Sequence, residues 1–500
     1  MRTDRSTSLA DLGLTARGGR EAEVTGLAID SREVREGMLF AALPGSRVHG
    51  GEFIQYALRQ GAGAVLTDPE GAEIAADVLE GADAALVLSE DPAAALARAA
   101  ALWYGAQPAV MVAVTGTNGK TSVASFCRQI WQALGHEAVN VGTTGVEGDY
   151  TLPLRHTTPD ALTLHRALAE AATAGITHAA MEASSHGLDQ RRLDGVALSA
   201  AGFTNLSQDH LDYHADMRAY FEAKLGLFER VLDEEGVVVA NLDDAYGAEI
   251  AGRAAARGQE VIGIGRAAEA RFRLMAQRFD ATGQELRFNW EGAPHMLRLE
   301  LIGGFQAANV ALAAALVIGA GEAPEDVFAT LPKLRTVRGR MELAATRDNG
   351  AAAYVDFAHT PDAVATAIQA LRPHVMGRIV AIVGAGGDRD RGKRPLMGRA
   401  AAEHADQVIV TDDNPRSEDP ALIRAAVMDG ARQGGDATKL TEVADRAEAI
   451  LRGVDALGPG DALLICGKGH ETGQIVGDTT HPFDDAEQAS IAVAALEGRA

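Results

Sequence analysis

The sequence predicts an α/β protein that is divided into three domains and built on parallel sheets. Its length of 500 residues is too great for one core, because a domain usually has roughly 100–200 residues. Short apolar runs alternate with amphipathic helical patterns along most of the chain, which is typical of βαβ units. A glycine-rich segment between one such run and the following helix has the composition of a phosphate-binding turn.

The composition is that of a folded protein, with 47% hydrophobic and 23% charged residues, and it excludes a disordered chain. Lys and Arg number 46 and Asp and Glu 69, which gives a formal net charge of −23. This charge argues against a protein that coats nucleic acid, since such proteins neutralise phosphates with cations. Small anionic ligands remain compatible, because a basic pocket can lie within a negative surface.

The chain shows no sign of secretion or of membrane insertion. Cys127 and Cys466 are too few for a disulfide framework or a cysteine metal cluster, so a reducing compartment is expected. The first residues are polar and lack the apolar core of a signal peptide. The uncharged stretches 99–119 and 301–321 are rich in Ala and Gly, and a buried strand or helix is favoured over a membrane span. We therefore expect a cytoplasmic protein without a membrane span.

The first domain is expected at residues 1–106 and the second at 107–337, with a boundary near Leu334–Arg340. Apolar runs bounded by turn residues predict the strands of both domains. The expected strands are Leu27–Asp30, Leu39–Leu43, Ala64–Thr67, Ala85–Leu88, Ala109–Val114, His178–Met181, Ala200–Thr204 and Val237–Asn241. Helical periodicity predicts helices at Ser122–Leu134, Ala161–Ala174 and 307–320.

The third domain is expected at residues 338–500 and repeats the alternation of strands and helices. The expected strands are Ala352–Phe357, Ile379–Val383, Gln407–Thr411 and Ala462–Cys466, and the expected helices are Asp362–Leu371 and Ala421–Ala431. This order again favours a parallel sheet covered by helices.

The segment Gly116–Ser122 follows an apolar strand and precedes a helix, which is the context that a phosphate loop requires. Glycines let backbone N–H groups turn toward phosphate oxygens, and the helix adds its positive end. Lys120 can reach the β- and γ-phosphates, and Thr121 can offer its hydroxyl to Mg²⁺. The strict spacing G-x-x-x-x-G-K-[ST] is not met, because Val114 takes the first glycine position. A glycine-rich turn without a ligand is the alternative.

Acidic and histidine side chains follow two more strands. Glu182 directly follows the expected strand 178–181. Ligands gather at the carboxyl ends of strands in α/β sheets, so Glu182 is placed where it can ligate Mg²⁺. The segment Asp209–His214 contains two Asp and two His, which suggests metal or phosphate chemistry. A solvated loop acid and a polar, helix-capping loop are the alternatives. Lys224 alone indicates a solvated charge, since Mg²⁺ repels an ammonium group.

Taken in chain order, these motifs resemble the Mur ligases of peptidoglycan synthesis over nearly the whole chain. The motifs that carry the resemblance are Asp30–Arg32, Gly50–Phe53, Gly116–Ser122, His156–Pro159, Glu182–Gly187, Asp209–Asp212, Lys224, Gly339–Glu342, Asp356–Asp362, Gly386–Asp390, Asp413–Arg416 and Gly467–Glu471. The resemblance implies an N-terminal domain that binds the UDP-muramoyl group and a central P-loop ATPase-type domain with a parallel or mixed sheet. It also implies a Rossmann-like C-terminal domain for the amino acid.

The resemblance also implies a role for individual residues. ATP binding is expected at Gly116, Thr117, Asn118, Gly119, Lys120, Thr121, Ser122, Asn309, Arg340 and Asp356. The UDP-muramoyl dipeptide is expected at Ser31, Thr157, Thr158, Ser184, Gln190 and Arg192. Diaminopimelate is expected at Arg389, Asp413, Asn414, Pro415, Arg416, Gly467 and Glu471. The implied catalytic residues are Lys120, Glu182, His210 and Lys224, and the implied metal ligands are Thr121, Glu182, His210 and Lys224 as a carbamate.

Two positions depart from the family pattern. Gly304-Phe305-Gln306 stands where Gly-x-Phe-Asn is usual, and Phe357 stands where Tyr is common. Neither departure is expected to touch a residue with a chemical role, so the implied activity is left intact.

The implied reaction is amide formation driven by ATP with Mg²⁺. The γ-carboxylate of D-glutamate in UDP-N-acetylmuramoyl-L-alanyl-D-glutamate takes the γ-phosphate, and the amine of meso-diaminopimelate then attacks the acyl phosphate. meso-Diaminopimelate has one carboxylate more than L-lysine, and Arg416 offers a planar fork that matches a carboxylate. A lysine in that pocket would leave the cation unpaired. A turn without a ligand is the alternative for the isolated Asn414–Arg416 segment.

Three rival functions remain at this stage. The first is the same ligase with L-lysine as its acceptor. The second is a folylpolyglutamate synthetase-like ligase, which would lack a uridine-nucleotide domain. The third is a nucleotide-dependent binding protein, which would need no acceptor pocket around Arg389, Arg416 and Glu471. A monomer is expected for the enzyme.

Overall fold

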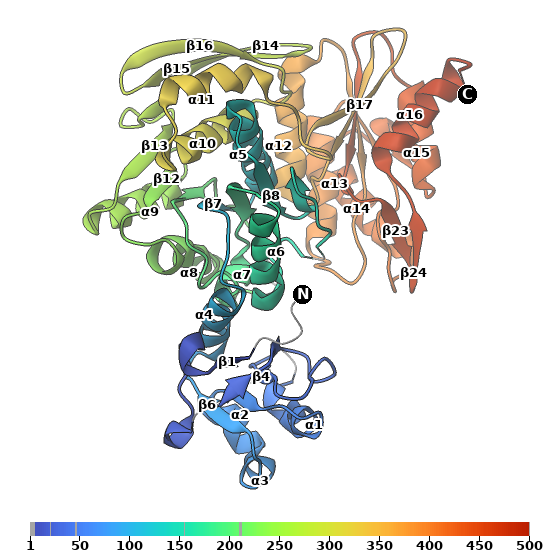
Figure 1. Ribbon diagram of the computed structural model, residues 1–500. Helices are drawn as coiled ribbons and strands as arrows, with labels where there is room; N and C mark the ends of the chain where they lie inside the picture. Colours follow the sequence, from blue (N-terminus) through green and yellow to red (C-terminus); the bar gives the residue numbers. More distant parts are fainter. Residues whose placement is uncertain (1–5, 21, 46–47, 155, 210–212, 500) are drawn as a thin grey trace.

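The computed structural model describes residues 6–20, 22–45, 48–154, 156–209 and 213–499. Three units, each built around its own sheet, follow one another along the chain, with the N-terminal unit at the bottom of Figure 1 and the C-terminal unit at the right. The predicted α/β class is confirmed, because the three large sheets contain parallel strands covered by helices. Among the described residues, no helix combines the length and the apolar character needed to cross a membrane.

The N-terminal unit is a parallel sheet of four strands in sequence order. The strands are β3 (Leu27–Ala28), β4 (Leu39–Ala42), β5 (Ala64–Thr67) and β6 (Ala85–Leu88), and β1 (Thr7–Ser8) pairs with β2 (Glu23–Val24) beside them. The short helices α1 (Ile54–Arg59), α2 (Pro69–Ile74) and α3 (Ala76–Leu79) lie between the strands, and α4 (Pro92–Tyr104) leads into the next unit. Asp91, which caps α4, forms an ion pair of 2.8 Å with Arg191 of the central unit.

The central unit contains a mixed sheet of ten strands in the order β16-β15-β14-β13-β12-β11-β7-β10-β8-β9. Its parallel strands are β7 (Val110–Thr115), β8 (Ala138–Gly142), β10 (His178–Glu182), β11 (Ala200–Phe203), β12 (Val237–Asn241) and β13 (Val261–Gly265). The strands β9 (Gly145–Gly148), β14 (Phe272–Asp280), β15 (Gly283–Trp290) and β16 (Ala293–Leu299) add antiparallel pairs.

The side chains of β7 show how the central sheet is buried on both faces. Val112 and Val114 pack into one apolar cluster, and Met111 and Ala113 pack into another on the opposite face. Helices α5 (Lys120–Leu134), α10 (Gln306–Gly319) and α11 (Pro324–Thr330) contribute to the first cluster. Helices α6 (Ala161–Thr173), α7 (Ser185–Asp189), α8 (Met217–Gly226) and α9 (Ala245–Ala256) contribute to the second. Burial on both faces explains the continuous apolar runs in the sequence.

The C-terminal unit has six strands in the order β17-β18-β22-β19-β20-β21, all parallel except the edge strand β17. They are β17 (Glu342–Thr346), β18 (Ala352–Asp356), β19 (Ile379–Val383), β20 (Gln407–Val410), β21 (Leu440–Glu442) and β22 (Ala462–Cys466). Its helices are α12 (Pro361–Leu371), α13 (Lys393–His404), α14 (Pro420–Gly434), α15 (Arg446–Asp455) and α16 (Asp485–Leu496). A small hairpin, β23 (Gly473–Val476) and β24 (Thr479–Pro482), follows β22.

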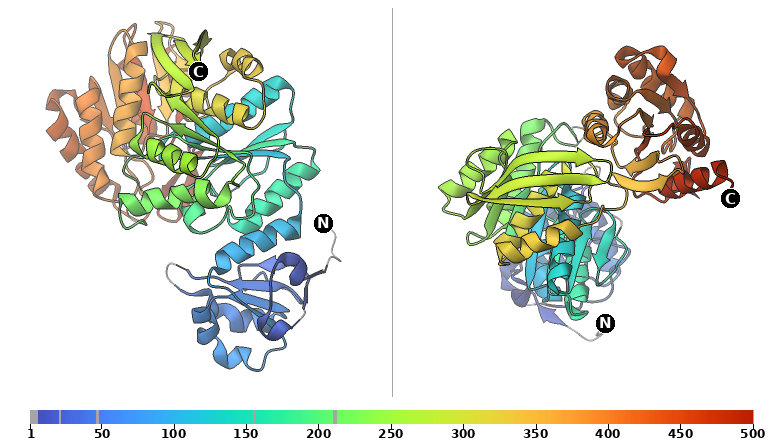
Figure 2. Two further views of the ribbon diagram at one scale, coloured as in Figure 1. Left: turned by 90° about the vertical axis from the view of Figure 1, so that its left-hand side faces the viewer. Right: turned by 90° about the horizontal axis from the view of Figure 1, so that it is seen from above.

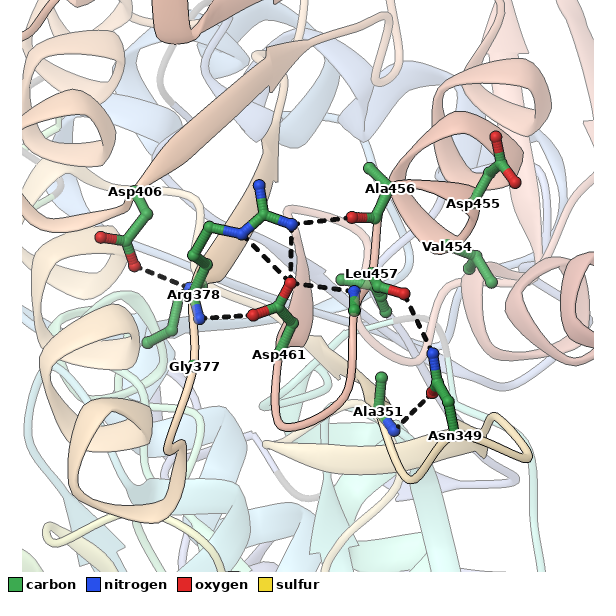
Figure 3. A network of polar contacts seen from close by, with 12 residues as sticks. Asn349, Ala351, Gly377, Arg378, Asp406, Val454, Asp455, Ala456, Leu457 and Asp461 are labelled. Atoms are coloured by element: carbon green, nitrogen blue, oxygen red, sulfur yellow. Dashed lines mark hydrogen bonds and ion pairs between the residues drawn. The ribbon is translucent and has the colours of Figure 1, made fainter.

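A polar network holds the starts of strands β18, β19 and β22 together, as Figure 3 shows. Asp461, only 7% exposed, accepts hydrogen bonds from the Arg378 backbone at 2.7 Å, the Arg378 guanidinium at 2.7 Å and the Gly458 backbone at 3.0 Å. Asn349 donates to the Leu457 carbonyl at 3.1 Å in the same network. This network lies at the edge opposite to the carboxyl ends of the parallel strands, which leaves those ends to the loops.

The strands β14–β16 reach from the central unit toward the C-terminal unit, as the right view of Figure 2 shows. His374 of the C-terminal unit contacts the Asp280 carbonyl at 2.7 Å, and the Gly303 N–H donates to its other ring nitrogen at 3.0 Å. The hydrogen bond from Gly303 makes Nε2 an acceptor, so Nδ1 carries the proton and donates to Asp280. One buried imidazole therefore joins two backbone segments of the central unit to the C-terminal unit.

Candidate active site

The phosphate loop connects β7 to α5 at the centre of the middle sheet. Gly116 has φ 145°, and a Cβ there would lie 1.9 Å from Thr204 Oγ1, so only glycine fits. Lys120 Nζ donates to the carbonyls of Gly116 at 2.9 Å and Thr117 at 2.7 Å. Burial lowers the pKa of Lys120, while the nearby Glu182 opposes this shift. The loop thus holds a half-buried lysine above its own backbone, where an anionic ligand can bind.

Glu182 lies at the end of β10, beside β7, and is 2% exposed. Its Oε2 accepts a hydrogen bond of 3.0 Å from the Thr121 hydroxyl, and its Oε1 accepts one of 2.9 Å from the Thr143 backbone. The Thr143 hydroxyl lies 3.0 Å from that of Thr157. Carboxylate and hydroxyl oxygens are the hard ligands that Mg²⁺ takes in proteins. The residues present therefore fit a Mg²⁺ ion at this position.

Lys224 enters the same site from α8 and is 1% exposed. Its Nζ donates to the Gly116 carbonyl at 2.8 Å and lies 4.4 Å from the centre of the Tyr220 ring. Burial and the neighbouring Lys120 lower the pKa of Lys224 well below its usual value, although Asp209 acts in the opposite direction. The uncharged amine is favoured by this environment, and an uncharged amine is a nucleophile.

Arg340 reaches the phosphate loop from the segment that precedes β17 of the C-terminal unit. Its guanidinium donates to the Thr121 hydroxyl at 3.2 Å and lies 4.4 Å from the centre of the Phe357 ring. Asp356 accepts hydrogen bonds from the backbones of Met341 at 2.7 Å and Ala358 at 2.9 Å. Burial raises the pKa of Asp356, and the Arg340 cation opposes this. A residue of the C-terminal unit thereby contacts the phosphate loop of the central unit.

Asn309 lies in the first turn of α10, close to the phosphate loop. A Cβ on Gly119 would come within 2.5 Å of Asn309 Oδ1. The Asn309 amide donates to Gln306 Oε1 at 3.1 Å. The expectation that neither sequence departure touches a residue with a chemical role is therefore wrong, since Gln306 contacts Asn309 and Phe357 contacts Arg340. An amide at 306 still supplies the oxygen that orients Asn309, and a phenyl ring at 357 still supports the guanidinium.

The residues expected to bind the dipeptide form one network beside Glu182. The Thr158 hydroxyl donates to the Glu182 carbonyl at 3.0 Å and accepts from the Ser184 backbone at 3.0 Å. Arg192 donates to the Thr158 carbonyl and to Gln190 Oε1, the latter at 2.6 Å. Burial lowers the pKa of Arg192. The hydrogen bonds thus connect Arg192 through Thr158 to Glu182.

Ser31 lies in the N-terminal unit, in the turn after β3, and is not part of this network. It is half-buried and stands between Asp30 and Arg32, which form an ion pair of 2.5 Å. The hydrogen bonds of Arg32 lower the pKa of Asp30 to about 2, so this exposed pair stays charged. A ligand that contacts both Ser31 and the central network must span two units.

The C-terminal subsite lies at the carboxyl ends of β20 and β22. Asn414 donates to Glu471 Oε2 at 2.8 Å and accepts from Lys468 Nζ at 2.9 Å. Lys468 is fully buried and lies 3.3 Å from the same Glu471 oxygen. Arg416 donates to the Gly387 carbonyl at 2.8 Å, and its backbone pairs with Ile475 of β23. The subsite therefore places a fixed acid, Glu471, and a cation, Arg416, on neighbouring loops.

The other residues expected here have varied surroundings. Arg389 is exposed, whereas Asp413 and Pro415 are buried. A Cβ on Gly467, which has φ 116°, would lie 2.5 Å from Asp413 Oδ2, so the two loops approach closely. His210 lies outside the described residues, and nothing is assigned to it structurally.

Sequence reasoning gave no role to three residues of the site. Thr143 follows the end of β8, at the same sheet edge as Glu182, so the rule for carboxyl ends of strands could have found it. Lys468 stands within the motif at 467–471 but was given no role. Lys393 begins α13, and burial lowers its pKa while Asp209 of the central unit opposes this. Only the approach of the two units brings Lys393 toward Asp209.

Three family models match the chain in succession. They describe the Mur ligase family catalytic domain over residues 23–104, the Mur ligase middle domain over 114–317 and the Mur ligase glutamate ligase domain over 339–469. The three matches thus cover parts of all three units of the structure.

Curated relatives match over nearly the full length. A UDP-N-acetylmuramoyl-L-alanyl-D-glutamate–2,6-diaminopimelate ligase of Caulobacter vibrioides is 49% identical over 482 residues, which cover 95% of this chain and 96% of the relative. The ligase of the same name from Bradyrhizobium diazoefficiens is 48% identical over 94% of this chain and 95% of its own.

Solved structures give the same picture. A structure of a UDP-N-acetylmuramoyl-L-alanyl-D-glutamate–2,6-diaminopimelate ligase superposes with a TM-score of 0.70 at 33% identity, covering 99% of this chain and all of its own. A folylpolyglutamate synthase of Mycobacterium tuberculosis complexed with ADP shares the fold, with a TM-score of 0.62 at 20% identity over 75% of this chain.

Proposed function

The chain belongs to the Mur ligase family, and we infer that it is the ATP-dependent ligase that adds meso-2,6-diaminopimelate to UDP-N-acetylmuramoyl-L-alanyl-D-glutamate. The observation that carries this function is the identity of 49% over 95% of the chain to a ligase of that name. The product is a precursor of peptidoglycan. The folylpolyglutamate synthase shares only the fold, and its match leaves a quarter of this chain uncovered.

We propose that the three units divide the ligands among them. Ser31 and residues 1–106 hold the UDP group, while Thr157, Thr158, Ser184, Gln190 and Arg192 hold the muramoyl dipeptide at the central unit. This assignment is supported by the network that connects Arg192 through Thr158 to Glu182. Arg192 is a half-buried cation that suits a carboxylate of the dipeptide.

ATP is proposed to bind between the phosphate loop and Arg340. Backbone N–H groups of residues 116–119 and the start of α5 receive the phosphates, and Lys120 turns from its loop carbonyls to the γ-phosphate. Arg340 and Asn309 contact the nucleotide from the other side, with Asp356 bracing the backbone beside Arg340. These preorganised cations neutralise charge as the D-glutamate γ-carboxylate attacks the γ-phosphorus and ADP leaves.

Mg²⁺ is proposed to bind at Thr121 and Glu182, whose oxygens lie 3.0 Å apart, and at His210. A bound Mg²⁺ shields phosphate charge and orients the phosphoryl group that is transferred. In the structure Thr143 holds one carboxylate oxygen of Glu182, and Thr121 contacts the other. This arrangement keeps the carboxylate aimed toward the phosphate loop.

Lys224 is proposed to carry a carbamate. The uncharged Nζ attacks CO₂, forms an N–C bond and releases one proton, so that a neutral amine becomes an anion. Two observations support this proposal: the lowered pKa of Lys224 and the proximity of its Nζ to the phosphate-loop carbonyl of Gly116. An anion at this position adds a further oxygen ligand for Mg²⁺ near Glu182.

The acceptor is proposed to bind at the C-terminal subsite. Arg416 and Arg389 bind its carboxylates, and Glu471 binds its distal ammonium between the loops of Asp413–Pro415 and Gly467. The amine then attacks the acyl carbon and loses a proton, and phosphate leaves. Lys468 and Asn414 support this role because they fix the Glu471 carboxylate. Domain closure excludes water from the acyl phosphate.

One assay tests the function. Phosphate release from ATP is measured with the UDP-muramoyl dipeptide and one acceptor at a time: meso-diaminopimelate, L-lysine or L-glutamate. We expect release with diaminopimelate and at least about 100-fold less with lysine, because lysine leaves Arg416 unpaired. Equal rates with lysine would overturn diaminopimelate as the specific acceptor. A separate reaction replaces the UDP-muramoyl dipeptide by a folate, and phosphate release there with glutamate would overturn the proposed ligase in favour of a folylpolyglutamate synthase.

A further inference from the structure

Three side chains that can ligate a transition metal lie together at the edge of the central sheet opposite to the phosphate loop. They are His136 after α5, His178 at the start of β10 and Glu322 after α10. Their ligand atoms lie within 4.8 Å of one another, with His136 Nε2 at 2.8 Å and His178 Nε2 at 3.9 Å from Glu322 Oε1. Within the described part of the chain, no other such group of His, Cys, Asp and Glu forms.

The backbone fixes two of these ligands at helix ends. Helix α5 stops at Gly135, with φ 94°, and the next N–H, of His136, donates to the Trp131 carbonyl at 3.0 Å. Helix α10 stops in the same way at Gly321, with φ 117°, and the N–H of Glu322 donates to the Val317 carbonyl at 3.3 Å. Two helix C-termini, which carry partial negative charge, therefore converge on the cluster and favour a cation.

Hydrogen bonds assign the tautomer of His178. The Thr177 hydroxyl donates to the Glu137 carbonyl at 3.2 Å, so its oxygen accepts from His178 Nδ1 at 2.8 Å. This leaves the lone pair of His178 Nε2 beside the Glu322 carboxylate, 3.9 Å away, with no proton between them. Burial and the neighbouring His136 lower the pKa of His178 to about 4, so the ring is neutral at neutral pH. A neutral imidazole oriented by its other nitrogen is the form that binds metals.

We propose that His136, His178 and Glu322 bind one divalent transition metal ion of the Zn²⁺ class, at a site separate from the nucleotide. Two imidazoles and one carboxylate are an established set of protein ligands for zinc. Bonds of about 2.0–2.1 Å in a tetrahedron put ligand atoms roughly 3.3 Å apart, which lies between the 2.8 and 3.9 Å present. The side chains of His136 and Glu322 are 34% and 24% exposed, so the ion has access from solvent, and water takes the fourth position.

The elements that meet at this ion are those that build the catalytic site at their other ends. Helix α5 begins with Lys120, α10 carries Asn309 near its start, and β10 ends with Glu182. His178 and Glu182 are the first and last residues of the five-residue strand β10, which places the two sites on the order of 13 Å apart. The ion would therefore stabilise the central unit by joining the far ends of three elements.

The experiment titrates Zn²⁺ into the full chain in the presence of excess Mg²⁺ and a non-hydrolysable ATP analogue, which fill the catalytic metal positions. Calorimetry is expected to show one equivalent of Zn²⁺ bound, and thermal unfolding is expected to shift upward. His136→Ala and Glu322→Gln should each weaken Zn²⁺ binding by at least about 100-fold, more than the loss of a supporting group costs. Both residues are half-exposed, so these variants are expected to keep the melting temperature of the metal-free protein.

Two matched controls accompany these variants. Glu325→Gln removes an exposed acid at the start of α11, and His295→Ala removes a histidine on β16, and both should bind Zn²⁺ as the unchanged chain does. Absence of Zn²⁺ binding under these conditions would overturn the proposal. Binding that persists in both His136→Ala and Glu322→Gln, or that disappears in Glu182→Gln instead, would also overturn it.

Discussion

Lys224 shows how burial changes the chemistry of one residue. The sequence alone indicated a solvated charge, whereas the structure places its amine within 2.8 Å of the phosphate loop and beside a second lysine. Periodicity could not predict this, because the contact joins residues 108 positions apart. The resemblance of the motifs supplied the role, and the environment explains why an amine that reacts with CO₂ can exist there.

Replacement of Lys224 tests the proposal that its side chain carries a carbamate. Lys224→Ala is expected to reduce kcat by on the order of 100-fold or more, as removal of a charged group near the transition state does. Added short-chain carboxylic acids should restore part of the rate, because they supply the missing anion. Lys333→Ala, at an exposed position of the same unit, is the control. Full activity of Lys224→Ala without any added acid would contradict the carbamate.

Arg416 is the residue proposed to determine the choice of acceptor. Its backbone is held between Ile475 and Gly477, and one guanidinium nitrogen is fixed by Gly387. Arg416→Ala should lower kcat/KM for diaminopimelate by about 100-fold, which equals about 2.7 kcal/mol of transition-state stabilisation, and leave KM for ATP within about twofold. Arg432→Ala removes an exposed arginine of α14 and should change neither constant. A parallel loss of ATP affinity in Arg416→Ala would assign the residue to the nucleotide instead.

Other contacts of site residues were beyond sequence reasoning, because they depend on which side chains the fold turns toward one another. Lys468 is fully buried only because Asn414 and Glu471 surround its ammonium. Gln306 and Phe357 were expected to be neutral departures, yet each contacts a residue that is proposed to bind the nucleotide. Motifs therefore predicted which segments form the site, while the hydrogen bonds within it required the fold.

At the scale of elements, continuous apolar runs predicted the buried parallel strands closely. The predicted strands Val237–Asn241, Ile379–Val383 and Ala462–Cys466 coincide with β12, β19 and β22. These strands are covered on both faces, so all of their residues except Asn241 are apolar. The antiparallel strands β14–β16 were missed, because one face is largely exposed and their residues mix apolar and polar types. The predicted strand at 27–30 ends at Ala28, since Asp30 turns to pair with Arg32.

The network of Figure 3 predicts a stability effect without a catalytic one. Asp461→Ala leaves the backbone N–H groups of Arg378 and Gly458 and a guanidinium without their partner. We expect the free energy of unfolding to fall by about 3 kcal/mol, measured by urea denaturation. The KM values at low temperature should not change, because the site lies at the opposite sheet edge. Asp429→Ala, which breaks an exposed pair, should cost less than about 0.5 kcal/mol.

At the scale of the whole molecule, two hydrogen-bonded contacts between the C-terminal unit and the central unit differ in character. His374 hydrogen-bonds to two backbone segments next to β14 and β15. Arg340 contacts Thr121 of the phosphate loop. The first contact is buried between protein segments, and the second belongs to the proposed ATP site.

This difference predicts that loss of Arg340 affects ATP binding, whereas loss of His374 affects the stability of the protein. Arg340→Ala should raise KM for ATP by about tenfold, as the loss of one charge-assisted hydrogen bond does, and leave the melting temperature of the ligand-free protein nearly unchanged. His374→Ala should lower that melting temperature, because it leaves the buried Gly303 N–H unpaired. Differential scanning calorimetry with and without nucleotide measures both. A large loss of ligand-free stability in Arg340→Ala would make it a structural clamp.

The separation between the Asp461 network and the acceptor loops bears on how such an enzyme can evolve. The starts of the strands are held together by the buried Asp461, whereas Arg389 is exposed and Arg416 is only half-buried at the other edge. Mutations in those loops can therefore accumulate without a large folding penalty. Acceptor specificity could therefore change to a different diamino acid by one substitution at a time in these loops, while the scaffold and the ATP chemistry stay unchanged.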